Sequence, residues 1–146
     1  MSRQIKNIFA ITAFLICIGL INIAGQNIDI EIRGMNAFTF ILIVAVLLQI
    51  IFFIPSFLLK TEKYYDLVGS LTYVTTVSLA YFAVENKTMI DSIIYFYVMV
   101  WALRLGIYLF RRVRNDGKDV RFEKAKRHFF WFLQYWMGQA LWVSLT

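Results

Sequence analysis

The sequence is poor in the residues that build disulfides and metal sites. Its 146 residues include one cysteine (Cys17), one histidine (His128) and one proline (Pro55). A lone cysteine within an apolar run excludes a disulfide framework inside the chain and a cysteine metal site. With a single histidine as well, no metal-binding motif is visible. The sequence therefore predicts neither a disulfide-linked scaffold nor a metal centre.

Motifs of common catalytic sites are also missing. The chain has no Gly-rich phosphate loop, no nucleophile elbow and no pair of acids at catalytic spacing. His128 stands beside Phe129, Phe130 and Trp131, a setting typical of anchoring at a membrane interface rather than of catalysis. Any chemistry would have to be carried by other residues.

Charged residues are scarce, at 16% of the chain, whereas 60% of the residues are hydrophobic and 18% are aromatic. The apolar surface that this composition implies exceeds what a soluble domain can bury, so the composition predicts a membrane protein. The net charge of +6 would suggest nucleic acid as a partner of a soluble protein. However, eight of the fifteen basic residues lie in the loop 111–127, between two apolar runs. That placement favours membrane topology, and we expect no nucleic-acid partner.

Five apolar runs approach the roughly 20 residues that cross a bilayer core. They are residues 8–24, 38–59, 66–84, 90–110 and 128–146. The first follows basic residues, as a secretory signal does, but its length and poor cleavage pattern favour an uncleaved span. We predict an all-α fold: one polytopic domain over residues 1–146, with about five transmembrane helices in contact with the lipid bilayer.

The distribution of basic residues predicts the orientation. Two lie at the amino terminus, two in the connector 60–63 and eight in the loop 111–127, whereas the other connectors hold only Arg33 and Lys87. Basic loops are retained on the cytoplasmic side. The amino terminus is therefore predicted to be cytoplasmic.

Arg104 lies inside the fourth run, roughly 10 Å from its end. An arginine at the centre of a span costs about 2.5 to 3.5 kcal/mol, so it should face protein or a wet cavity, or snorkel to the head groups. Its helical face carries aromatic and basic side chains: Tyr97, Trp101, Arg104, Tyr108, Arg111 and Arg112. Such a face suits a ligand with an apolar part and a phosphate part. An interfacial aromatic belt explains about half of these residues equally well.

An acidic partner for Arg104 is expected from the third run. Asp66, Ser70 and Tyr73 share a helical face there. We expect Asp66, or Glu62 just before it, to pair with Arg104; alternatively, Asp66 only favours the dipole at the start of its helix. In the fifth run, Gln134, Gly138 and Gln139 either line a polar interior or pair helices.

The loop 111–127 holds eight basic and three acidic residues. Residues 115–117, Asn-Asp-Gly, predict a turn, and charges of alternating sign follow at Lys118, Asp119 and Arg121. Topology accounts for the basic surplus, but a loop that only binds lipid needs no acids. Ordered ligand or partner binding and simple head-group attraction both remain open.

Two stretches resemble a known superfamily. TEKYYDLVGSLTYVTT, followed by WALRLGIYLFRRVRNDGKDVRFE, is similar to uncharacterised membrane proteins of the steroid 5-alpha-reductase C-terminal-domain superfamily, over residues 60–146. Its relatives of known activity use NADPH to reduce a carbon–carbon double bond conjugated to a carbonyl. The resemblance implies an NADPH site formed by Arg104, Tyr108, Arg111, Arg112, Asp119 and Arg121.

The chain departs from that pattern at two positions. Steroid reductases carry a tyrosine three residues before the helix arginine, where this chain has Trp101, and a glutamate on an earlier span, where it offers Gln49. The candidates for a catalytic phenol are then Tyr73 and Tyr97. Superfamily members also continue beyond the point that corresponds to Thr146. We therefore expect the chain to match their amino-terminal half and to need a membrane partner or a missing carboxyl-terminal half.

The resemblance implies a membrane protein like the amino-terminal half of an NADPH-dependent reductase of apolar, steroid- or lipid-like enones, inactive alone. One alternative is a lipid or isoprenoid methyltransferase, which would bind S-adenosylmethionine. The other is a non-enzymatic membrane protein whose basic loop binds anionic lipid or a partner. Whether the chain is an enzyme is open at this point.

Overall fold

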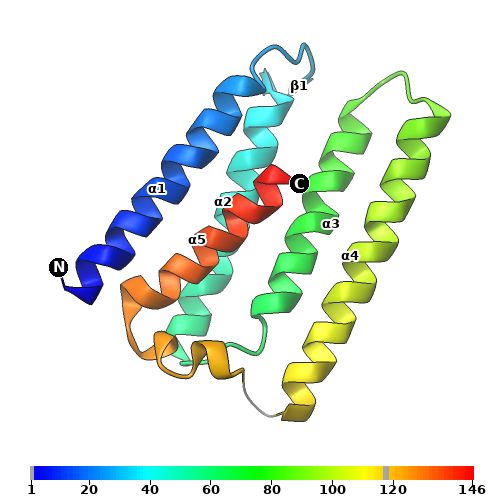
Figure 1. Cartoon of the computed structure of the whole chain (residues 1–146). Helices are drawn as coiled ribbons and strands as arrows, with labels where there is room; N and C mark the ends of the chain where they lie inside the picture. The colour runs from blue at the N-terminus through cyan, green and yellow to red at the C-terminus, as the bar shows by residue number, and fades with distance from the viewer. Residues whose placement is uncertain (1, 117–118) are drawn as a thin grey trace.

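The computed structural model describes residues 2–116 and 119–146, and it is a bundle of five α-helices (Figure 1). The helices are α1 (Arg3–Ala24), α2 (Ala37–Leu58), α3 (Tyr65–Ala83), α4 (Met89–Asp116) and α5 (Phe129–Leu145). Two 3₁₀ helices, η1 (Val120–Phe122) and η2 (Ala125–Arg127), connect α4 to α5. A hairpin of two short strands, β1 (Glu31–Ile32) and β2 (Met35–Asn36), connects α1 to α2. Apart from this hairpin, the predicted helical fold is confirmed.

Each predicted apolar run forms a helix, and three of the helices, α1, α2 and α4, are long and apolar enough to cross a membrane. The largest departure from the predicted boundaries is at α4, which continues through Arg111, Arg112 and Arg114 to Asp116. The predicted turn at 115–117 is therefore wrong for its first two residues, which are helical, while Gly117 lies outside the described residues. Three of the eight basic residues of 111–127 thus lie on a helix, and one of them, Arg112, reaches Asp66 on α3.

The hairpin was not predicted, because strands of two residues are too short to show an alternating pattern. Its turn places Arg33 and Gly34 at φ values of 55° and 76°. Two consecutive positive φ values are typical of the tight turn that matches strand twist. Asn36 then caps α2, since its side-chain oxygen accepts from the backbone N–H groups of Phe38 and Thr39.

Helix α5 packs against α1, α2 and α3, while α4 packs on the outer side of α3 (Figure 1). One end of the bundle holds η1 and η2 together with the starts of α1, α3 and α5 and the ends of α2 and α4 (Figure 1). We call it the loop end. Because α1 and α5 both begin there, these two neighbouring helices run in the same direction.

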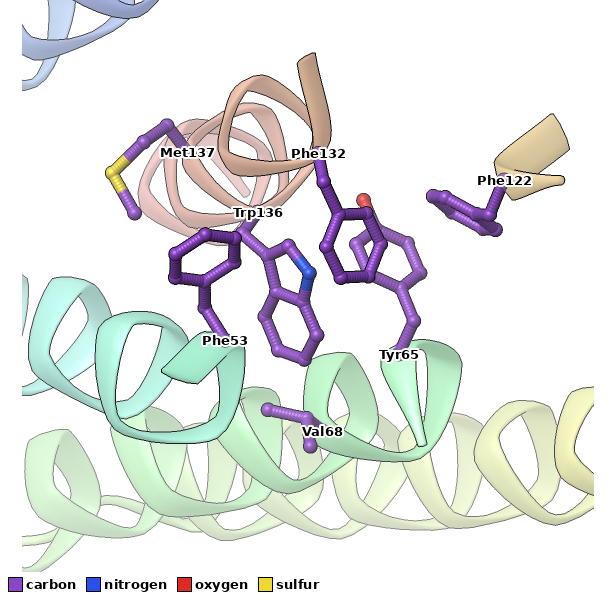
Figure 2. Close-up of a cluster of buried hydrophobic side chains, with 7 residues drawn as sticks. All are labelled: Phe53, Tyr65, Val68, Phe122, Phe132, Trp136 and Met137. Carbon is purple, nitrogen blue, oxygen red and sulfur yellow. The ribbon is translucent and has the colours of Figure 1, made fainter. Parts of the chain in front are cut away.

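The main core lies near the loop end, between α2, α3, α5 and η1. Figure 2 shows its buried side chains: Phe53, Tyr65, Val68, Phe122, Phe132, Trp136 and Met137. Phe122, from η1, packs against the rings of Tyr65 and Tyr135, at centroid distances of 4.7 and 4.9 Å. The connection between α4 and α5 is therefore held against the bundle by an aromatic anchor and lies in a defined position.

Candidate functional site

Acidic and basic side chains from α3, α4, the connection before α3 and the connection to α5 meet at the loop end. We call this group the charged network. Its members are Glu62, Asp66, Arg112, Asp119, Arg121 and Lys126. The three acids lie on segments that the Phe122 anchor and the α3–α4 packing bring together.

Asp119 and Arg121 form the centre of the charged network. The Nε atom of Arg121 donates to both Asp119 carboxylate oxygens at 3.0 Å, and its Nη2 atom donates to one of them at 2.6 Å. Nη2 also reaches Asp66 at 3.3 Å. Arg112 approaches the same two acids, at 3.8 Å from Asp66 and 3.5 Å from Asp119. Two arginines thus share two carboxylates.

The hydrogen bonds from the Arg121 side chain hold the pKa of the Asp119 carboxyl below its ordinary value. Partial burial opposes this shift, and the backbone N–H of Arg121 and the charge of Arg112 reinforce it. The same hydrogen bond raises the pKa of Arg121. Both groups are therefore charged at neutral pH.

A second pair lies deeper in the charged network. The Nζ atom of Lys126 donates to Glu62 Oε2 at 2.6 Å, and the backbone N–H of Asp119 donates to the other oxygen at 3.2 Å. The Glu62 side chain is only 3% exposed. A buried carboxylate persists only when it is paired and hydrogen-bonded, so this pair fixes η1 and η2 to the start of α3.

The prediction that Asp66 or Glu62 pairs with Arg104 is wrong. Asp66 pairs with Arg112 and Arg121, and Glu62 pairs with Lys126. Arg104 lies eight residues before Arg112 on α4, which is about 12 Å along the helix, and its side chain is exposed. Asp66 also lies in the first turn of α3, where a carboxylate favours the helix dipole.

The aromatic and basic face predicted on α4 is largely on the outside of the bundle. The buried positions of this helix are Ala102, Gly106 and Val113, on the opposite side. Tyr97, Arg104, Tyr108 and Arg111 are exposed. Sequence spacing gave the shared face correctly, but the small residues that let α4 approach α3 decide which face turns inward.

A cavity of about 540 Å³ lies beside α3, between α4 and α5, and ends at the charged network. Its polar end is formed by Asp66 and Arg121. Most of the lining is apolar or aromatic and comes from four α-helices; it includes Phe14, Tyr65, Tyr73, Trp101, Leu105, Leu109, Tyr135 and Trp142. Its size falls within the range of small-molecule sites, about 300 to 1,000 Å³.

Two glycines leave room for polar side chains of the cavity wall. A Cβ atom at Gly69 would collide with the amide group of Gln139, so the absence of a side chain lets this amide lie against α3. Gly106 similarly leaves room for Ser70, whose hydroxyl donates to the Ala102 carbonyl at 2.6 Å. The Oε1 atom of Gln139 is buried, and it has no hydrogen-bond partner among the described residues. Gln134, Gly138 and Gln139 all line this cavity, and Gln139 also packs against α3 at Gly69.

The two candidate phenols, Tyr73 and Tyr97, lie in different surroundings. Tyr73 lines the cavity, with its ring edge-on to Trp101 at 5.1 Å and its hydroxyl 2.7 Å from the Thr146 hydroxyl. Tyr97 is 69% exposed and is not part of the lining. The six residues assigned to a cofactor are also divided: Arg112, Asp119 and Arg121 are in the charged network, and Arg104, Tyr108 and Arg111 are on the outer face of α4.

The sequence did not single out Lys126 or Gly69. Lys126 is one basic residue among eight in its loop, and no local pattern distinguishes the lysine that meets Glu62. Gly69 lies within a helical run, where a glycine is a weak signal of close packing.

The fold and the site define a helical protein with three helices long and apolar enough to cross a membrane and with an amphipathic cavity. A family model described as a protein of unknown function (DUF1295) matches residues 51–146, and the chain belongs to this family. The matched segment contains the whole charged network and every cavity residue except Phe14. No curated protein and no solved structure matches the chain.

Proposed function

We propose that the cavity beside α3 binds a small, mostly apolar molecule that carries a hydrogen-bond donor. The observation that carries this proposal is the buried, unpaired Oε1 atom of Gln139 in an otherwise largely apolar wall. A buried acceptor without a partner costs about 1 to 3 kcal/mol. A ligand hydroxyl or amide that came within hydrogen-bond reach of this oxygen would remove that cost, whereas a purely apolar ligand would not.

The route into the cavity supports an apolar ligand. Trp101, Leu105 and Trp142 line the cavity and are also exposed on the outside of the bundle. In a membrane these side chains would face lipid, so a molecule dissolved in the bilayer would reach the cavity without crossing water. The charged network at the other end would exclude apolar groups and fix which end of the ligand enters.

The test compares two isoprenoid probes of the same shape. Farnesol carries a hydroxyl donor, and farnesyl methyl ether does not. Binding to the purified protein in detergent, followed by quenching of tryptophan fluorescence, should favour farnesol by roughly tenfold, the equivalent of about one hydrogen bond. Gln139→Leu should remove the preference, whereas Asn86→Leu, an amide replacement on an exposed loop, should keep it. Equal binding of the two probes by the unchanged protein would refute the proposal.

The finer proposal is an NADPH-dependent reductase of an apolar enone, completed by further helices. It is supported by the resemblance and by the position of Tyr73, whose phenol lies at the cavity wall. A phenol there would donate to a carbonyl oxygen as negative charge develops on it.

The described residues fit the phosphates of NADPH poorly. Arg112 and Arg121 are already bound to Asp66 and Asp119, and Arg104 is on the outer face of α4. When bound, NADPH would supply the hydride. Thermal unfolding separates the possibilities: protection by NADPH favours the reductase, protection by S-adenosylmethionine favours the methyltransferase, and protection by neither leaves a binding protein.

We also propose that all five helices cross the membrane, with the amino terminus in the cytoplasm. Helices α3 and α5 lie alongside the three that are long and apolar enough, and the 17 residues of α5 span about 26 Å. A reporter fused at Lys87 should be extracytoplasmic, and one fused at Lys124 cytoplasmic. The opposite result at either site would refute this orientation.

A further inference from the structure

The basic residues at the loop end fall into two groups with different surroundings. Arg112, Arg121 and Lys126 are paired with carboxylates in the charged network. Arg3 and Arg127, on the α1–α5 side, form no ion pair with any described residue. Positive charge is thus left uncompensated by the described residues on the α1–α5 side of the loop end, as it also is at the exposed Arg111 and Arg114 at the end of α4.

These two arginines border a separate cavity, of about 370 Å³, at the start of α1 and α5. We call it the amino-terminal cavity. Its lining is Arg3, Gln4, Asn7, Arg127, His128, Phe129, Phe130 and Trp131. None of these residues is acidic. A neighbouring hollow of about 330 Å³ shares four of them and adds Lys124 and Glu123.

The backbone around the amino-terminal cavity also favours an anion. Helices α1 and α5 both begin there, so the positive ends of two helix dipoles lie side by side. The N-cap residue of α5, His128, makes no side-chain capping hydrogen bond, and neither helix has an acid in its first turn. The first backbone N–H groups of α5 therefore remain available as donors.

An independent observation comes from Asn7. This residue is only 9% exposed and lines the amino-terminal cavity, and its amide makes no hydrogen bond to any described residue. Its amide is therefore free to bind a ligand that enters this cavity. The Arg3 guanidinium is meanwhile held over the Trp131 ring, at 3.9 Å from its centroid, so one cation is already in position.

We infer that the amino-terminal cavity is a binding site for a phosphate group. Arg3 and Arg127 would contribute charge, the first turn of α5 would contribute backbone donors, and Asn7 would contribute its amide. The exposed rings of Phe129 and Phe130 beside the cavity are suited to the acyl chains of a lipid that carries such a phosphate. This site is separate from the cavity beside α3, and it does not depend on the function proposed for that cavity.

The experiment uses the purified full chain in a neutral detergent and native mass spectrometry. Dioctanoyl phosphatidic acid is compared with dioctanoylglycerol, which has the same acyl body and no phosphate. The protein should retain the phosphatidic acid preferentially. The double variant Arg3→Gln/Arg127→Gln should lose at least roughly tenfold of this binding, because each charge-assisted hydrogen bond is worth about that factor or more.

The matched control is Arg111→Gln/Arg114→Gln, which removes the same charge from exposed arginines at the end of α4. It should change the binding less than twofold. The variant Arg3→Lys/Arg127→Lys keeps the charge and should keep measurable binding. Binding by this variant would show that substitution at these two positions does not by itself unfold the protein. Asn7→Asp should weaken binding through repulsion at unchanged side-chain size.

A parallel arm with inorganic phosphate identifies the source of the anion. If the lipids bind alike, but inorganic phosphate raises the melting temperature of the unchanged protein and not that of Arg3→Gln/Arg127→Gln, the site takes a free phosphate. If neither phosphate compound is preferred, or if the control loses as much as the test variant, the inference is overturned.

Discussion

Replacing Lys126 by methionine removes the cation from a carboxylate that is almost fully buried. The Glu62 side chain is 3% exposed, and its Oε2 atom is 2.6 Å from Lys126 Nζ. Breaking a buried ion pair from one side costs about 3 to 5 kcal/mol, since the remaining charge stays desolvated. Lys126 itself is 21% exposed and the Asp119 N–H still donates to Glu62, so we expect the lower end, about 3 kcal/mol.

The assay is reversible unfolding in mixed micelles, followed by tryptophan fluorescence. Lys126→Met should lower the free energy of unfolding by about 3 kcal/mol. Adding Glu62→Gln should restore at least about 1 kcal/mol, because a neutral amide is less costly to bury than an unpaired carboxylate. The control is Lys63→Met, the same change at an exposed position, which should stay within about 0.5 kcal/mol of the unchanged protein. If Lys126→Met behaves like this control, or if Glu62→Gln brings no recovery, Glu62 is not desolvated as described.

Two further predictions concern acid stability and helix packing. Because the folded-state pKa of Asp119 is depressed, its pair with Arg121 stabilises the protein above the unfolded value of about 3.9, and this contribution is lost as the pH falls toward the folded value. Melting temperatures between pH 6 and 2.5 should therefore drop less in Asp119→Asn than in the unchanged protein, and parallel curves would count against the pair. Gly106→Ala places a methyl group on Ser70 at the α3–α4 contact and should cost about 1 to 3 kcal/mol. Gly19→Ala meets nothing within 4 Å and should be neutral or stabilising; equal losses at both positions would argue against close packing at Gly106.

The helices were predictable because their signal is local. A long apolar run needs no knowledge of its neighbours, and all five runs became helices. The charged network was only partly predictable. The sequence indicates that Asp66 and Glu62 belong to ion pairs, but the depth of Arg104 in its span wrongly favours it as their partner. The real partners come from the end of α4 and from the connection that Phe122 anchors.

The residues of the candidate site were likewise only partly predictable. Tyr73 and the glutamines of α5 were named from the sequence, and they line the cavity beside α3. Tyr97 and Arg104 share a helical face with Trp101, and the same spacing rule supported them equally, yet they lie outside the cavity. Spacing tells which residues share a face, but it does not tell which face the neighbouring helix covers.

The sequence by itself determined the class of protein, the number and place of the helices, and the concentration of basic residues at one end. These depend on composition and on interactions along a single segment. Only the tertiary structure decided which cations are neutralised, because ion pairing depends on distances between segments far apart in the chain. It also decided that the Gln139 side-chain oxygen is buried without a partner among the described residues, since burial is a property of the whole bundle.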